Sequence, residues 1–324
     1  MKTKLLRKLA GIVALSAVMG TALSAQDRNE VIKVYNEGAK ASQTDIPAAI
    51  ASFENVIVLA DKAGGTADDL KQKAVQVLPG LYFKLAYNAL NEKKPAADVI
   101  RAAKTSIAAA EKYGNKTNKE NSEKVLLQAY TNLASEYFSK NEYDKAITVY
   151  DSVLTINPDY LTAIYNKALI YVKQDNQEEF EKTIDIFIEK LKAANDQDKV
   201  KQASKMALEY FRSAGSRANQ AEKLDDALAL LNKAAKYGED KDLYYYFADV
   251  YNKQQNFDAG LDNAQKGLAL EPGDNNAKAK FYFQIATAQL GKGQKTEACA
   301  SYKLAMFGAF AEPSKVQRSN LKCQ

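Results

Sequence analysis

Large and small residues recur along this chain in a fixed order. Between Leu127 and Pro158, apolar residues follow one another at intervals of three and four, first over 130–137 and then over 146–154. Each set lies on one face of a helix, and the polar pair Asn141-Glu142 separates the two sets. Pro158 ends the second helix, since proline has no backbone N–H and disfavours helix in the residue before it. The segment therefore predicts two paired helices joined by a tight turn.

The same order returns further along the chain. Copies begin at residues 127, 161, 208, 241 and 279, so the steps between them are 34, 47, 33 and 38 residues. The long step contains extra residues near 178–204, where Phe187 and Leu191 continue a helical pattern. We therefore expect lengthened helices in this region and not a loop. A recurring unit of this length is typical of a stacked array of helical repeats.

This pattern resembles the tetratricopeptide repeat (TPR) family, whose unit of about 34 residues has an aromatic and small-residue signature. The copy at 127–158 matches nearly every signature position, with Tyr130 where the family prefers Trp. The copy at 241–272 departs from it, with Gly260 and Gly267 in place of Ala. The resemblance implies an all-α, right-handed superhelical solenoid of antiparallel helix pairs. It also implies that the first helices line a concave groove.

The predicted organisation has five parts. Residues 1–25 form a signal peptide, 26–113 form diverged helix pairs of the same type, and 114–122 form a flexible linker. The main repeat array covers 123–308, and residues 309–324 form a C-terminal capping helix. The cap is expected because a stacked array needs a last helix with one polar face.

The signal peptide is predicted from the first 25 residues. Four basic residues precede an uncharged stretch, 9–25, which ends in the small residues Ser24 and Ala25. This is typical of a secretory leader cut between Ala25 and Gln26. The alternative, a retained membrane anchor, needs a longer apolar segment than this one, which Gly11 and Gly20 interrupt. We therefore expect a periplasmic or secreted protein with no membrane span after cleavage.

Charge and composition then limit the function classes. The chain has 45 basic and 40 acidic residues, and removing the four basic residues of the leader leaves 41 against 40. A nearly neutral protein lacks the basic surface that nucleic acid requires. The chain has no His, the commonest general base and metal ligand. Adjacent carboxylates such as Asp225-Asp226 do not share a helix face. We expect no enzyme activity, no cofactor and no metal.

The two cysteines, Cys299 and Cys323, predict a disulfide. An exported protein reaches an oxidising compartment, where two cysteines usually bond. The alternative is redox or metal chemistry, but the chain has no CxxC spacing and no His to support it. The bond would join the capping helix to the last repeat.

The resemblance assigns a set of groove residues at fixed positions of the first helices. These residues are Thr131, Ser135, Phe138, Tyr165, Leu169, Arg212, Tyr245, Asp249, Asn252 and Phe283. Members of the family that clamp the carboxylate of a chaperone tail use Lys and Asn at such places, and this chain does not reproduce that clamp. The expected groove is aromatic and amphipathic, with Arg212 as an isolated positive charge. The alternative is that some of these residues only pack against neighbouring turns.

The predicted function is a non-catalytic scaffold or adaptor of a bacterial cell envelope, which presents its concave groove to a peptide or partner protein. Aromatic side chains with a few polar anchors suit an extended peptide or a partner helix. The alternative is an accessory ligand-capture protein that binds a glycan or peptide in an envelope uptake pathway.

Overall fold

The computed structural model describes residues 27–324, and every regular element within them is a helix. The predicted signal peptide lies outside these residues. The chain divides into two compact units, one up to Ala163 and one from Ile164 onward. The division falls inside helix α7 (Leu161–Lys173). No helix within residues 27–324 is long and apolar enough to cross a lipid bilayer.

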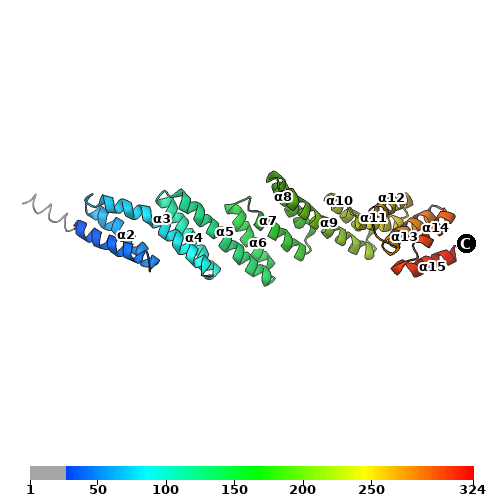
Figure 1. The fold of residues 1–324 in the computed structure, drawn as a ribbon, viewed down its shortest axis with the longest axis horizontal. Helices are drawn as coiled ribbons and strands as arrows, with labels where there is room; N and C mark the ends of the chain where they lie inside the picture. The colour runs from blue at the N-terminus through cyan, green and yellow to red at the C-terminus, as the bar shows by residue number, and fades with distance from the viewer. Residues whose placement is uncertain (1–26) are drawn as a thin grey trace, which may run out of the picture. The chain divides into compact units, whose positions relative to one another are not determined.

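Unit 1 begins with a helix over residues 27–41, followed by five further helices (Figure 1). These are α2 (Ile46–Lys62), α3 (Asp68–Asn91), α4 (Ala96–Lys112), α5 (Lys116–Ser139) and α6 (Tyr143–Ile156). Each packs against the next in the chain, and α3 also packs against α5. The unit is therefore a stack of antiparallel helix pairs.

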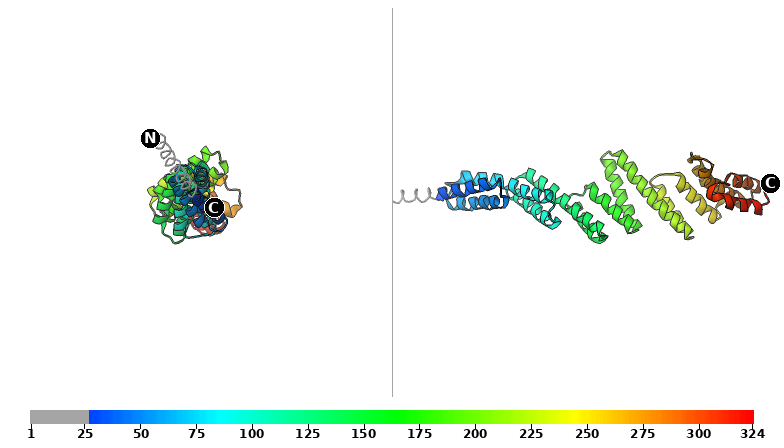
Figure 2. Two further views of the ribbon diagram at one scale, coloured as in Figure 1. Left: turned by 90° about the vertical axis from the view of Figure 1, so that its left-hand side faces the viewer. Right: turned by 60° about the horizontal axis from the view of Figure 1, so that its bottom comes forward.

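Unit 2 repeats this arrangement after α7, and within each unit the pairs follow one another in chain order (Figure 2). Its helices are α8 (Gln177–Ala193), α9 (Gln197–Gln220), α10 (Leu224–Ala235), α11 (Lys241–Lys253), α12 (Phe257–Ala269), α13 (Asn275–Gly291), α14 (Lys295–Leu304), the short 3-10 helix η1 (Gly308–Phe310) and α15 (Ala311–Asn320). Helix α11 packs against both α9 and α13, so these three form one layer, which we call the first-helix layer.

The tight turns between paired helices follow from local chemistry. Asn141, in the turn between α5 and α6, has a φ of 58°. Asn195, in the turn between α8 and α9, has a φ of 60°. Asn tolerates this left-handed conformation better than most residues. Asp196 then caps α9 by accepting a hydrogen bond from the N–H of Lys199 at 3.1 Å. The predicted turn at Asn141-Glu142 and the predicted long helices at 178–204 are both confirmed.

The linker predicted at residues 114–122 is wrong. Helix α5 begins at Lys116, and only a short turn separates it from α4. Gly114 has φ of 70°, and the side chain of Asn115 accepts a hydrogen bond from the N–H of Asn118 at 2.9 Å. Ser122, inside the predicted linker, is fully buried, and its hydroxyl lies 2.7 Å from that of Ser106. The polar residues of this stretch form the first turns of a helix because a cap starts it.

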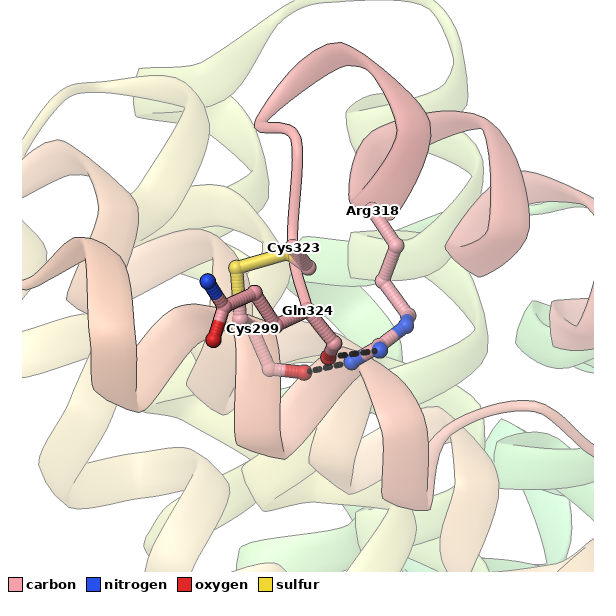
Figure 3. Close-up of a disulfide and its surroundings, with 4 residues drawn as sticks. All are labelled: Cys299, Arg318, Cys323 and Gln324. Atoms are coloured by element: carbon pink, nitrogen blue, oxygen red, sulfur yellow. Dashed lines mark hydrogen bonds between the residues drawn. A yellow bond between two sulfur atoms is a disulfide. The ribbon is translucent and has the colours of Figure 1, made fainter.

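The C-terminal cap is held to the last helix pair by covalent and polar contacts (Figure 3). Helix α15 packs on α14, and the predicted disulfide joins Cys299 to Cys323 with a Cα–Cα distance of 5.6 Å. The guanidinium of Arg318 donates hydrogen bonds to the carbonyl oxygens of Cys299 and of Gln324, the latter at 3.0 Å. The last residues of the chain are therefore fixed against the last helix pair.

Candidate partner-binding surface

In unit 1, the three predicted groove residues on α5 form a small, weakly polar surface. The hydroxyl of Thr131 donates to the carbonyl oxygen of Leu127 at 2.8 Å, and that of Ser135 donates to the carbonyl of Thr131 at 2.9 Å. The ring of Phe138 lies 5.7 Å from that of Tyr143, across the turn to α6. The hydroxyl donors are thus used within α5, and Phe138 is a packing residue.

In unit 2, Tyr165 and Leu169 lie on α7. Tyr165 is 37% exposed, and its ring centre lies 5.4 Å from that of Phe187 on α8. Leu169 is half-buried. The two residues contribute an apolar, partly exposed surface next to α8.

The prediction that Arg212 is an isolated positive charge is wrong. Its guanidinium forms an ion pair with Oδ2 of Asp240, and both side chains are mostly buried. Asp240 also caps α11, since its Oδ1 accepts a hydrogen bond from the N–H of Leu243 at 2.7 Å. The arginine of α9 therefore holds the first turn of α11 and is not free to bind a partner's carboxylate.

Tyr245 is the aromatic centre of the first-helix layer. Its half-buried ring lies 5.3 Å from the ring of Tyr246 and 5.3 Å from Nζ of Lys280, which sits over it. Burial raises the pKa of its phenol to about 12, and the nearby charge of Asp249 adds to this effect. Lys280 also forms an ion pair with Asp242 at 2.5 Å. The phenol therefore stays neutral and the cation above it is held in place.

Asp249 links three helices of the same layer. Its carboxylate accepts hydrogen bonds from the amide of Asn219 on α9 at 2.6 Å and from the amide of Gln284 on α13 at 2.8 Å. Lys253 forms an ion pair with it at 2.9 Å and also donates to Asn219. Gln284 was not predicted as a site residue. The sequence feature that indicates a role for Gln284 is its polar side chain within the apolar pattern of α13, beside Ile285.

Two predicted groove residues pack against other parts of unit 2 instead, Asn252 in the interior and Phe283 at a partly buried position. Asn252 is only 7% exposed, and its Nδ2 donates to both the backbone carbonyl and the side-chain oxygen of Gln284. It turns inward because Gly260 on α12 leaves room for it. Phe283 packs edge-on against Tyr302 and against Phe310 of η1. The C-terminal cap thus covers a ring that was expected to face a partner.

The first-helix layer has a consistent chemical character. Arg212–Asp240 and Asp242–Lys280 are ion pairs between neighbouring helices, and Asp249–Lys253 is an ion pair within α11. Within residues 27–324, no cluster of His, Cys, Asp and Glu is arranged to hold a metal ion. The layer therefore presents an internally paired surface with the adjacent rings of Tyr245 and Tyr246.

Stacked antiparallel helix pairs with short turns define an all-α, TPR-like fold. The TPR repeat family model matches residues 134–175, from the end of α5 through α7. The fold is thus TPR-like, and residues 134–175 carry the sequence pattern of the TPR repeat. Such repeats are in general non-catalytic and bind proteins, and no catalytic family matches. A comparison with curated proteins gives no match.

Solved structures with a similar chain trace include two that are described as TPR proteins, and yeast Tom70. YrrB, described as a TPR protein with an unusual peptide-binding site, is 20% identical, with 58% of this chain and 91% of that chain covered and a TM-score of 0.35. A tetratricopeptide repeat protein from Parabacteroides merdae is 16% identical over 92% and 99% of the two chains, with a TM-score of 0.30. Yeast Tom70 is 12% identical over 94% and 75%, with a TM-score of 0.29.

Proposed function

We propose that this chain is an exported, non-catalytic scaffold or adaptor of a bacterial cell envelope. In this proposal the first-helix layer of unit 2 holds a peptide or partner protein. Half-buried aromatic side chains beside satisfied polar groups are typical anchors of protein interfaces. The observation that carries the proposal is the ring of Tyr245, fixed under Lys280 and beside the Asp249 network.

The paired charges of the layer indicate the chemistry of the partner. Because Arg212, Asp249 and Lys280 each have an ion-pair partner within the unit, a strongly charged ligand would have to compete with these pairs. An amphipathic segment with apolar anchors avoids that competition. The partner surface is therefore expected to be apolar and aromatic at its centre, with neutral hydrogen-bonding groups around it.

Export rests on the leader pattern of residues 1–25, and the disulfide supports it. Disulfides persist in oxidising compartments and are rare in the bacterial cytoplasm. Fusing residues 1–40 to a reporter that is active only after export should give activity outside the cytoplasm. A fusion beginning at residue 26 should give none. Equal activity from the two fusions would contradict export.

Photo-crosslinking tests the partner surface in cells. A photoreactive residue at Tyr246, beside Tyr245, should give one dominant crosslinked protein, and Tyr245→Ala should remove that product. The matched control places the same photoreactive residue at Gln265, an exposed position of α12, which is not part of the first-helix layer. The proposal fails if position 246 gives no more product than position 265, while the melting temperature shows that each variant is folded.

A further inference from the structure

The C-terminal cap, residues 309–324, lies along one face of α13. Immediately before it, Gly308 approaches α13 so closely that a Cβ atom at this position would overlap Oδ1 of Asn276. Two turns further along α13, the ring centre of Phe283 lies 5.4 Å from that of Phe310 in η1. Asn276 and Phe283 are seven residues apart and therefore share a helix face. The cap thus covers the outer end of the first-helix layer.

The covered face is apolar. Phe283 and Leu290 are seven residues apart on α13, and both pack against the small core of the last helix pair. The ring of Phe283 also lies edge-on to that of Tyr302, with ring centres 5.5 Å apart. Movement of the cap away from α13 would therefore expose an aromatic ring in the same layer that carries Tyr245.

The cap itself contributes little to a hydrophobic core. Within the described residues, η1 has no buried side chain, and Ser314 is the one buried residue of α15. The hydroxyl of Ser314 is buried without a hydrogen-bond partner in this part of the chain, which is unfavourable. Val316, the apolar residue two positions on, is 54% exposed. Burial of apolar surface therefore holds the cap only weakly.

A covalent bond that solvent can reach holds the cap in place of a core. Cys323, the penultimate residue, is bonded to Cys299 of α14, and both residues are only partly buried (Figure 3). Arg318 donates hydrogen bonds to carbonyl oxygens at this same end of the cap. The chain has two cysteines in all, so a reductant has a single disulfide to attack.

The last helix pair has an interior that does not include the cap. Ala286, Ala298 and Tyr302 are at most 2% exposed and join α13 to α14. The hydroxyl of Ser301 on α14 lies 2.7 Å from Oε1 of Gln289 on α13, to which it donates. Helix α13 also packs against α11 and α12. Helices α13 and α14 should therefore stay folded when the cap is released.

We propose that the C-terminal cap is a thiol-controlled cover over the Phe283 face of α13. A thiolate of a dithiol reductant attacks the Cys299–Cys323 bond and forms a mixed disulfide, which the second thiol of the reductant resolves. Two electrons and two protons pass to the chain, which gains two thiols, and the reductant leaves as its own disulfide. The cap then separates from α13, and reoxidation of the two cysteines closes it again. This device does not depend on the proposed partner surface around Tyr245.

Hydrogen exchange of the mature chain, residues 26–324, tests the release. Dithiothreitol should make the amides of α15 exchange about tenfold faster or more, with less than about a twofold change in α13 and α14. Removing the reductant and adding oxidised glutathione should restore slow exchange. The double variant Cys299→Ala with Cys323→Ala should exchange rapidly in α15 with or without dithiothreitol.

A dye that fluoresces on apolar surface tests what the cap covers. Reduction should increase the dye signal, and Phe283→Ala should remove most of that increase. The matched control is Leu270→Ala at the end of α12, which removes an apolar side chain that is 50% exposed while the cap is closed. This variant should leave the increase on reduction unchanged. The exchange experiment needs no change at position 283, so it stands even if Phe283→Ala does not fold.

Three results would overturn the proposal. Slow exchange in α15 after reduction would show that contacts other than the disulfide hold the cap. Equal acceleration in α13, α14 and α15 would make the bond a structural tie of the whole helix pair and exclude a separate cover. A disulfide that excess dithiothreitol leaves intact in the folded chain would exclude control by thiols. None of these measurements uses a partner protein, so they are independent of the proposed function.

Discussion

Asn252 of α11 occupies the space that a side chain at position 260 of α12 would need. A Cβ atom built on Gly260 would overlap Oδ1 of Asn252 and lie 2.8 Å from its Cγ. The amide of Asn252 continues inward to α13, where Nδ2 donates to the backbone carbonyl of Gln284 at 3.0 Å. The glycine is therefore present because a polar side chain, and not a small one, fills this helix crossing.

Gly260→Ala should destabilise unit 2. The added methyl group forces Asn252 out of a close-packed crossing, which costs about 1–3 kcal/mol and lowers the urea midpoint. The matched control is Gly80→Ala on α3, where no atom lies within 4 Å of the new Cβ. That substitution should raise stability by about 1 kcal/mol, because alanine is the better helix former.

A double variant separates the clash from helix propensity. Asn252→Ala together with Gly260→Ala restores two small residues at the crossing, so it should be more stable than Gly260→Ala alone. If Gly260→Ala proves as stable as Gly80→Ala, the space at this crossing is not limiting and the explanation is incorrect.

The pair Arg212–Asp240 should stabilise α11 in two separable ways. Asp240→Ala removes both the cap and the ion pair and should cost about 1–2 kcal/mol. Asp240→Asn keeps a capping oxygen and loses only the charge, so its cost should be smaller. Hydrogen exchange of the amides of residues 241–244 measures the fraying. Equal effects of the two variants would show that the cap contributes nothing.

Reducing the disulfide should destabilise the C-terminal end of unit 2. Cys299 and Cys323 are 24 residues apart, and loop entropy for such a closure gives about 3 kcal/mol. A reductant should lower the melting temperature and increase the rate of amide hydrogen exchange in α15. The reason is that the C-terminal cap is then held only by Arg318 and apolar contacts. The double variant Cys299→Ala with Cys323→Ala should melt like the reduced protein and not respond to reductant.

Glu271 should make stability depend on acid pH. Hydrogen bonds from Lys241 at 2.8 Å and from the N–H of Gly273 lower the pKa of this nearly buried carboxyl below its ordinary value of 4.5. Its contribution is present above pH 4.5 and is lost as the pH falls through the lowered pKa. Glu271→Gln should therefore have a lower urea midpoint at pH 7, and the difference should narrow below pH 4. Glu297→Gln, which removes an exposed carboxylate of α14, is the matched control for the loss of one negative charge.

The helices could be predicted because their signals are local. Apolar residues at intervals of three and four give the faces of α5 and α6, and Asn141 marks the turn between them. The prediction of a linker at 114–122 fails because polar residues are typical both of irregular chain and of a helix start, and Asn115 provides the cap that starts α5. Composition alone did not distinguish a polar loop from a capped polar helix start.

The site was less predictable, because repeat position fixes the helix that carries a residue but not its contacts. Tyr245 and Asp249 lie in the first-helix layer, whereas Asn252 is buried against Gln284 and Phe283 packs against the C-terminal cap. A polar residue turns inward only where a neighbouring helix offers space and a partner. Those neighbours, Gly260 and Gln284, do not enter the repeat signature.

The sequence by itself determined that this chain forms paired helices with tight turns, that its composition does not favour catalysis, and that its two cysteines can bond. Only the tertiary structure decided which polar side chains are paired within the protein and which remain available to bind a partner. Asp249 meets Asn219 across 30 residues of sequence, Asn252 meets Gln284 across 32, and Arg212 meets Asp240 across 28. Helix periodicity is set by neighbouring residues, whereas a charge is satisfied by whatever the stacking of helices brings within hydrogen-bonding distance.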